Sequence, residues 1–179
     1  MTTMPRRLLG TSMAVGLLLA LATAVVGSQV RNYVAPLSGG EEVPANASKG
    51  RGSAIFQLRA DGTHLDYRIT ASNIANVHMA HIHGPAAAGA NTGVVVWLFP
   101  STTPGAGPLG SGRHDGVLAT GTITAANLVG AFAGQPLSVL VNAIETGQAY
   151  VNVHTNDGMG AINTGIGDLQ NGEIRGQLP

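Results

Sequence analysis

The chain of 179 residues contains no cysteine, and only 10% of its residues are charged, with a formal net charge of zero. Without cysteine it can form no disulfide and offers no thiolate to a metal or a substrate. Without a basic excess it lacks the charge that binds the phosphate backbone of nucleic acids. We therefore expect no nucleic-acid partner, and only histidine and methionine remain as soft-metal ligands.

The chain also lacks the sequence pattern of a hydrolase. It has no GxSxG nucleophile elbow, and no nucleophile stands beside a base in the sequence. Since no other catalytic motif is evident, we expect a binding protein more than an enzyme and assign no catalytic residue.

The first 27 residues have the composition of an export signal. Arg6 and Arg7 precede an apolar run from Leu8 to Ala22, and small residues follow. These features predict a signal peptide over residues 1–27, cleaved after about residue 24–27. An uncleaved anchor is the alternative, because Leu8 to Gly27 is about 20 residues long and could just span a bilayer. Cleavage leaves one domain, residues 28–179, secreted or located in the periplasm or cell envelope and free of the membrane.

Short stretches of alternating apolar residues follow this segment. Ala54, Phe56 and Leu58 alternate with polar or outward residues, and a second such stretch follows the turn at Ala60-Asp61-Gly62. Similar stretches recur between Gly-rich loops to the end of the chain. Six to eight short strands with these connections predict an all-β fold, an antiparallel, Greek-key-like β-sandwich or barrel.

One segment changes from strand to helix periodicity. Leu137, Leu140, Val141 and Ile144 lie at positions i, i+3, i+4 and i+7. This spacing predicts a helix that ends near Gly147, and a helical turn is also expected at residues 125–129.

Three of the six histidines lie close together in NVHMAHIHGPAAAG, residues 76–89. On a strand, His81 and His83 project from one face, opposite the apolar Ala80 and Ile82. In AYVNVHT, residues 149–155, His154 likewise projects opposite the valines. If the two strands are neighbours, the three imidazoles can bind one metal ion, since neutral imidazole is the commonest metal ligand.

Two further side chains are candidate ligands. Met79 has the same parity as His81, and a thioether beside imidazoles favours copper over zinc, although zinc stays an alternative. His78 has the opposite parity and would need a bulge to join the site. The competing interpretation of the histidines is a polar network that shapes the Gly84-Pro85 loop. His64, beside a turn, and His114, in a Gly/Pro-rich loop, are expected to be ordinary hydrogen-bonding surface residues.

The last predicted strand, GEIRGQL, places Glu173 and Arg175 on one face. We expect mainly a polar strand surface with these two as neighbours. The alternative is that Glu173 accepts a hydrogen bond from a ligand histidine and orients it.

These motifs together carry a family resemblance. The order of LSGGEEVP, AHIHGPA, AYVNVHT and GEIRGQL resembles the CHRD domain family, named from chordin, from about Val34 to Pro179. The resemblance implies an extracytoplasmic, mostly β domain, found singly in secreted bacterial proteins and repeated in animal proteins that bind growth factors. It also places His81, His83, His154, Glu173 and Arg175 at motif positions.

A fainter similarity is to copper-zinc superoxide dismutase, a Greek-key sandwich with a His-x-His strand. The stretch GDLQNG, residues 167–172, resembles one of its loops, but the cysteines and a bridging histidine are missing. Three functions follow as hypotheses: an exported, non-enzymatic metal-binding domain, with copper preferred; an extracellular protein-binding or adhesion module that acts through loops such as 85–92 and 100–116; and a dismutase-like copper redox protein.

Overall fold

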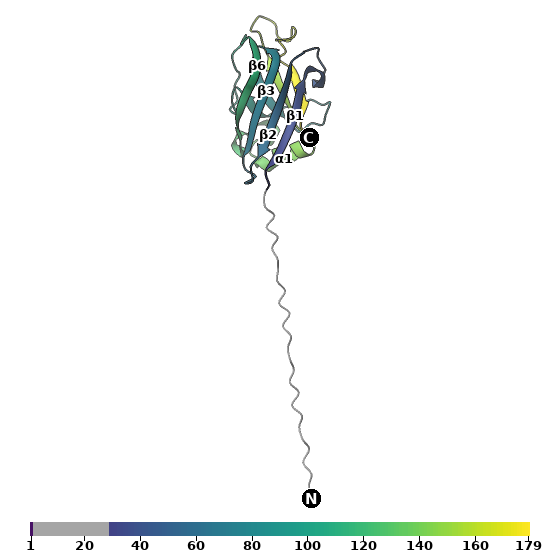
Figure 1. The fold of residues 1–179 in the computed structure, drawn as a ribbon, viewed down its shortest axis with the longest axis vertical. Helices are drawn as coiled ribbons and strands as arrows, with labels where there is room; N and C mark the ends of the chain where they lie inside the picture. The colour runs from purple at the N-terminus through teal and green to yellow at the C-terminus, as the bar shows by residue number, and fades with distance from the viewer. Residues whose placement is uncertain (2–28) are drawn as a thin grey trace.

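The computed structural model describes Met1 and residues 29–179 (Figure 1). The predicted signal peptide, residues 1–27, lies almost wholly outside the described part. Within that part, no helix is both long and apolar enough to cross a membrane.

Eight strands form one sheet that closes nearly into a barrel, which confirms the all-β prediction. They are β1 (Arg31–Ser38), β2 (Arg51–Leu58), β3 (Leu65–Ala75), β4 (Val77–His83), β5 (Val94–Phe99), β6 (Arg113–Ile123), β7 (Tyr150–Thr155) and β8 (Ile174–Gln177). The helical elements are α1 (Leu137–Glu145) and the 3-10 turns η1 (Gly39–Glu41), η2 (Ala125–Asn127) and η3 (Gly130–Phe132).

The order of strands across the sheet is β5-β4-β7-β8-β1-β2-β3-β6, and all the pairs are antiparallel. Figure 1 shows β1, β2, β3 and β6 side by side along one wall, with α1 at one end of the body. The edge strand β5 lies close to β3. The Tyr67 hydroxyl on β3 donates a buried hydrogen bond of 2.8 Å to the Leu98 carbonyl on β5. The topology brings β4 beside β7, although most of the chain's second half separates them in sequence.

Period-two alternation builds the core. The side chains of Ala54, Phe56 and Leu58 on β2 are at most 2% exposed, whereas Ile55 between them is 42% exposed. Phe56 is the register partner of Tyr67 on β3, and the two rings pack with centroids 6.3 Å apart. The two alternating stretches predicted on either side of the Ala60-Asp61-Gly62 turn are therefore confirmed as strands, and they form a hairpin with its turn between Leu58 and Leu65.

The helix α1 covers one end of this core and is also as predicted. Its apolar residues Leu137, Leu140, Val141 and Ile144 are all buried. It ends in a Schellman motif, in which Gly147 N–H donates to the Ile144 carbonyl and Gln148 N–H to the Ala143 carbonyl. The motif requires a left-handed residue, and Gly147 supplies it with φ of 65°. The chain is thereby turned directly into β7.

One placement differs from the sequence-based expectation. His114 lies in β6, as the register partner of Ile74, and not in the preceding loop. The strand is longer than its apolar pattern indicates because β6 continues past a register shift to pair with the end of β3. Backbone pairing with a long neighbour, which no local pattern reveals, extends the strand.

Candidate metal centre

The three predicted ligand histidines come together between β4 and β7. In the register of these strands Met79 pairs with His154, His81 with Asn152 and His83 with Tyr150. The intervening residues Ala80, Ile82, Val151 and Val153 are fully buried in the core. The histidines therefore project from the opposite face, as strand parity predicts.

This opposite face is itself covered. The side chains of His81, His83 and His154 are 3%, 8% and 6% exposed. Their coverage comes from loops, since a carbonyl of the loop after β4 and one of the loop before β8 contact two of the rings. The site thus lies beneath loops, on the outer side of the barrel wall, with its histidine side chains buried.

The rings converge at distances suited to a shared ion. One ligand nitrogen from each histidine lies within 4.8 Å of the others, and His81 Nδ1 lies 3.0 Å from His154 Nε2. Two nitrogens bound to the same zinc or copper ion at roughly 2.0–2.1 Å are about 3.3–4 Å apart. Small shifts of the side chains would therefore complete a three-imidazole site.

Backbone carbonyls hold two of the rings in a fixed orientation. His83 Nδ1 donates to the Thr92 carbonyl and His154 Nδ1 to the Gln170 carbonyl, each at 2.8 Å. A carbonyl can only accept, so in both neutral rings the proton sits on Nδ1 and the lone pair on Nε2. This arrangement is the usual one for histidines that ligate a metal.

Two other ring nitrogens of these histidines lack hydrogen-bond partners. His81 Nε2 and His83 Nε2 are buried without a hydrogen-bond partner. Burial lowers the pKa of His81 to about 2 and of His154 to about 4, and it also lowers the pKa of His83. The rings are consequently neutral at physiological pH, the form that binds metal.

Aromatic rings enclose the site, and sequence reasoning overlooked their part in it. The Trp97 ring packs edge-on against His81, with centroids 4.3 Å apart. The Tyr150 ring stacks parallel to His83 at 4.8 Å, and the Arg175 guanidinium lies 3.4 Å above the Tyr150 ring. Strand parity could have placed Tyr150 at the site, because it shares the face of His154.

Arg175 and Glu173 lie in different environments and do not form a salt bridge with each other. Arg175 is 2% exposed and donates to the Asn91 side chain and the Ala90 carbonyl, each at 2.8 Å. Through Tyr150 it reaches His83. The Glu173 carboxylate is fully buried and accepts hydrogen bonds from Ser48 Oγ, Thr155 Oγ1 and Gly167 N–H. Among the described residues, no histidine donates to it, so its observed bonds tie loops to β7.

The two weaker candidates lie beside the cluster. Met79 is half-buried and faces His154 across the strand pair. His78 is buried but points elsewhere, since its Nδ1 bonds the Gly107 carbonyl at 3.0 Å, and it is not part of the group of three. The register shift between Val77 and Met79 does not bring His78 into that group.

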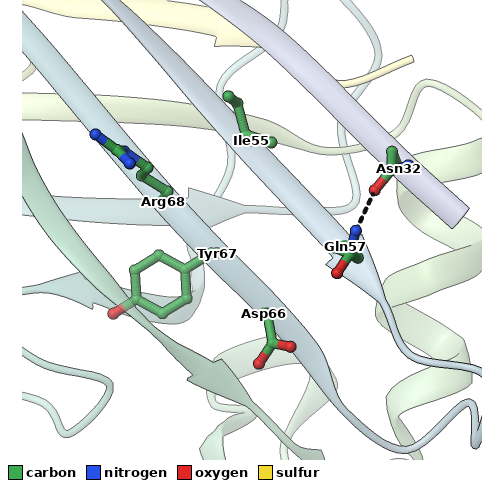
Figure 2. A pocket seen from close by; sticks show the side chains of 6 residues that line it. All are labelled: Asn32, Ile55, Gln57, Asp66, Tyr67 and Arg68. Carbon is green, nitrogen blue, oxygen red and sulfur yellow. Dashed lines mark hydrogen bonds between the residues drawn. The ribbon is translucent and has the colours of Figure 1, made fainter. Parts of the chain in front are cut away.

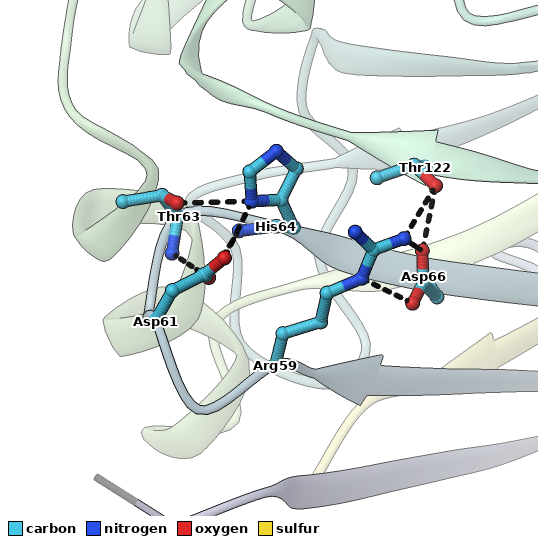
Figure 3. A network of polar contacts seen from close by, with 6 residues as sticks. All are labelled: Arg59, Asp61, Thr63, His64, Asp66 and Thr122. Carbon is cyan, nitrogen blue, oxygen red and sulfur yellow. Dashed lines mark hydrogen bonds and ion pairs between the residues drawn. The ribbon is translucent and has the colours of Figure 1, made fainter.

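His64 is a surface residue beside a turn, as expected (Figure 3). Its Nδ1 lies 2.8 Å from Asp61 and 3.0 Å from the Thr63 hydroxyl. Next to it, Arg59 makes a two-point contact with Asp66. This network fixes the turn between β2 and β3 and offers no second converging histidine.

A separate pocket lies on the outer face of β1, β2 and β3. It is lined by Asn32, Ile55, Gln57, Asp66, Tyr67 and Arg68, with a hydrogen bond from Gln57 to Asn32 (Figure 2). Its lining includes no histidine and a single carboxylate, so it presents no comparable set of metal ligands.

Comparison with known proteins supports the family resemblance. No curated protein and no solved structure matches the chain. The protein-family model of the CHRD domain matches residues 33–178, which include every strand from β2 to β8 and all three histidines of the candidate centre. Because this match spans most of the sequence, the chain belongs to the CHRD domain family.

Proposed function

We propose that this protein is an exported metal-binding domain that holds one ion through His81, His83 and His154. The observation that carries the proposal is the pair of buried, unpartnered nitrogens, His81 Nε2 and His83 Nε2, within a cluster of neutral imidazoles. Burying a polar atom without a partner is unfavourable, and a bound cation would satisfy both atoms.

Copper is the metal that this donor set favours. The cluster contains imidazoles and no carboxylate or thiolate. Three imidazoles suit copper or zinc, and the half-buried Met79 thioether, opposite His154, would add preference for Cu(I). The proposed role is sequestration or presentation of the ion, without catalysis.

Export agrees with this role. The N-terminal segment has a basic start, an apolar run and small residues, and the absence of cysteine leaves the domain indifferent to the redox state of its compartment. We therefore place the protein outside the cytoplasm, secreted or in the cell envelope.

The test is a calorimetric titration of the protein, purified after expression with its own N-terminal segment. Cu(II), Cu(I) under reducing conditions, and Zn(II) are added in turn. We expect one copper ion per chain, and loss of that binding in a His81→Ala/His83→Ala variant. A His64→Ala/His114→Ala variant is the matched control and should bind as the wild type does. Undiminished binding by the first variant would refute the site.

A second candidate function, binding of a protein partner, is favoured by one surface feature. Leu109, Met159, Ile162 and Ile166 are all at least 50% exposed. Their two loops lie side by side, because Gly110 N–H donates to the Asn156 carbonyl at 2.9 Å. A pull-down from envelope extract should return a partner with the wild type and lose it when these four residues are changed to serine. Equal recovery by both proteins would reject this surface.

A further inference from the structure

A pocket of about 340 Å³ opens onto the candidate centre from outside. Pro44, Thr92 and Asn171, from three different loops, contribute to its walls, and His83, Tyr150 and Asn152 line it from the sheet. It joins the solvent to His83, one of the three candidate ligands.

Two unpartnered polar atoms belong to residues that line this pocket. His83 Nε2 carries a lone pair with no hydrogen-bond partner, and Asn152 Oδ1 is buried without a partner, in a residue that is 4% exposed. An amide oxygen can ligate a metal ion or accept a proton. In a site made by the three imidazoles alone, Asn152 Oδ1 still needs a proton donor.

Asn152 stands close to the proposed ion. It is the register partner of His81 and lies on the same face of β7 as His154, two residues away. A donor that satisfies its Oδ1 would therefore lie near the metal as well as in the pocket. Water bound to the metal meets both requirements, because coordination leaves its protons free to donate.

We propose, resting on the metal-binding function above, that the ion keeps one coordination position open toward this pocket, where water binds and small anions can replace it. Asn152 Oδ1 accepts the proton of the bound water. The three imidazoles then form an open site, in which the fourth position exchanges with solvent, and not a closed structural one.

The Arg175 guanidinium supplies positive charge beside the pocket, and its charge also acts on the nearby Glu42 carboxyl. The guanidinium of Arg175 is stacked on Tyr150, which lines the pocket. None of the ion pairs formed within the described residues involves Arg175. Its positive charge and that of the ion would both attract an anion that enters between the loops.

The test uses azide, a small anion that binds copper(II) at open positions. The protein is loaded with one equivalent of Cu(II), unbound metal is removed, and bound copper is measured before azide is added. We expect a saturable azide-to-copper charge-transfer band, with a matching change in the electron paramagnetic resonance spectrum.

Two variants test whether the anion reaches the metal through this pocket. Asn171→Trp, at an exposed pocket residue that is not a proposed ligand, should keep the bound copper but lose the azide band at concentrations that saturate the wild type. Val117→Trp, at an exposed position on β6, should behave as the wild type does. Copper retained without an azide response in the wild type would overturn the open position and leave metal binding intact. An equal response in Asn171→Trp would overturn the pocket as its route, and failure to bind copper would overturn both proposals.

Discussion

The Nδ1 atom of His81 lies 3.0 Å from the Nε2 atom of His154, across 73 residues of sequence. Because His154 Nδ1 donates to the Gln170 carbonyl, the short contact is a hydrogen bond from His81 Nδ1–H to the lone pair of His154. A metal ion that binds His154 Nε2 would use this same lone pair, so the hydrogen bond from His81 would be lost when the ion binds.

Trp97 should report metal binding by fluorescence. It is the only tryptophan, and its ring centroid lies 4.3 Å from that of His81. We expect stoichiometric Cu(II) to quench the emission strongly, because a paramagnetic ion bound to His81 would be very near the indole, whereas Zn(II) should quench little. A His83→Ala variant should need much more copper for the same effect. Quenching that is unchanged in this variant would show that the copper binds elsewhere.

Metal should stabilise the fold. The ion binds only when β4 and β7 are paired, so its binding free energy adds to that of folding. At free copper about 100 times the Kd, we expect the free energy of unfolding to rise by about 3 kcal/mol. Urea denaturation with and without copper measures this rise. It should disappear on addition of a chelator and in His154→Ala, and a rise that persists in that variant would count against the site.

Arg175 should be needed for the order of the site. Its guanidinium makes two hydrogen bonds and stacks on Tyr150, which stacks on His83. Lysine cannot reproduce this planar fork. We expect Arg175→Lys to lower the free energy of unfolding by about 2 kcal/mol and to weaken copper binding. The control Arg68→Lys, at an exposed position, should change neither the free energy of unfolding nor the affinity for copper. If Arg175→Lys changes these two quantities as little as the control does, the contacts of Arg175 contribute little.

Glu42 should make stability depend on pH. Burial raises its pKa from 4.5 to about 7, although the charge of Arg175 opposes the shift. The folded state therefore binds a proton more readily than the unfolded state, and this contribution to stability is lost as the pH rises from 4.5 to above 7. Glutamine cannot ionise. Over this pH range, the free energy of unfolding of Glu42→Gln should therefore rise relative to that of the wild type by up to about 3 kcal/mol.

Chemical denaturation of both proteins at a series of pH values measures this gain. The exposed neighbour Glu41, changed to glutamine in the same way, is the matched control. A constant difference between Glu42→Gln and the wild type across the range would contradict the account.

Strand parity alone predicted the faces of His81, His83 and His154, because alternation on a strand depends only on local sequence. It could not predict that β4 and β7 are neighbours, since pairing across the sheet depends on the whole topology. Nor could it reveal the loop carbonyls of Thr92 and Gln170 that orient the rings, because loop paths have no periodic signal. The alternative role of Glu173 is not observed: Ser48, Thr155 and Gly167 donate its hydrogen bonds, and no histidine of the described residues does so.

The central claim is that three imidazoles share one ion, and anomalous X-ray diffraction tests it most directly. A crystal of the copper-loaded protein is measured on both sides of the copper absorption edge. The account predicts one anomalous peak at about 2.0 Å from a ring nitrogen of each of His81, His83 and His154. Copper located elsewhere, or a peak that contacts fewer than three of these rings, would contradict it.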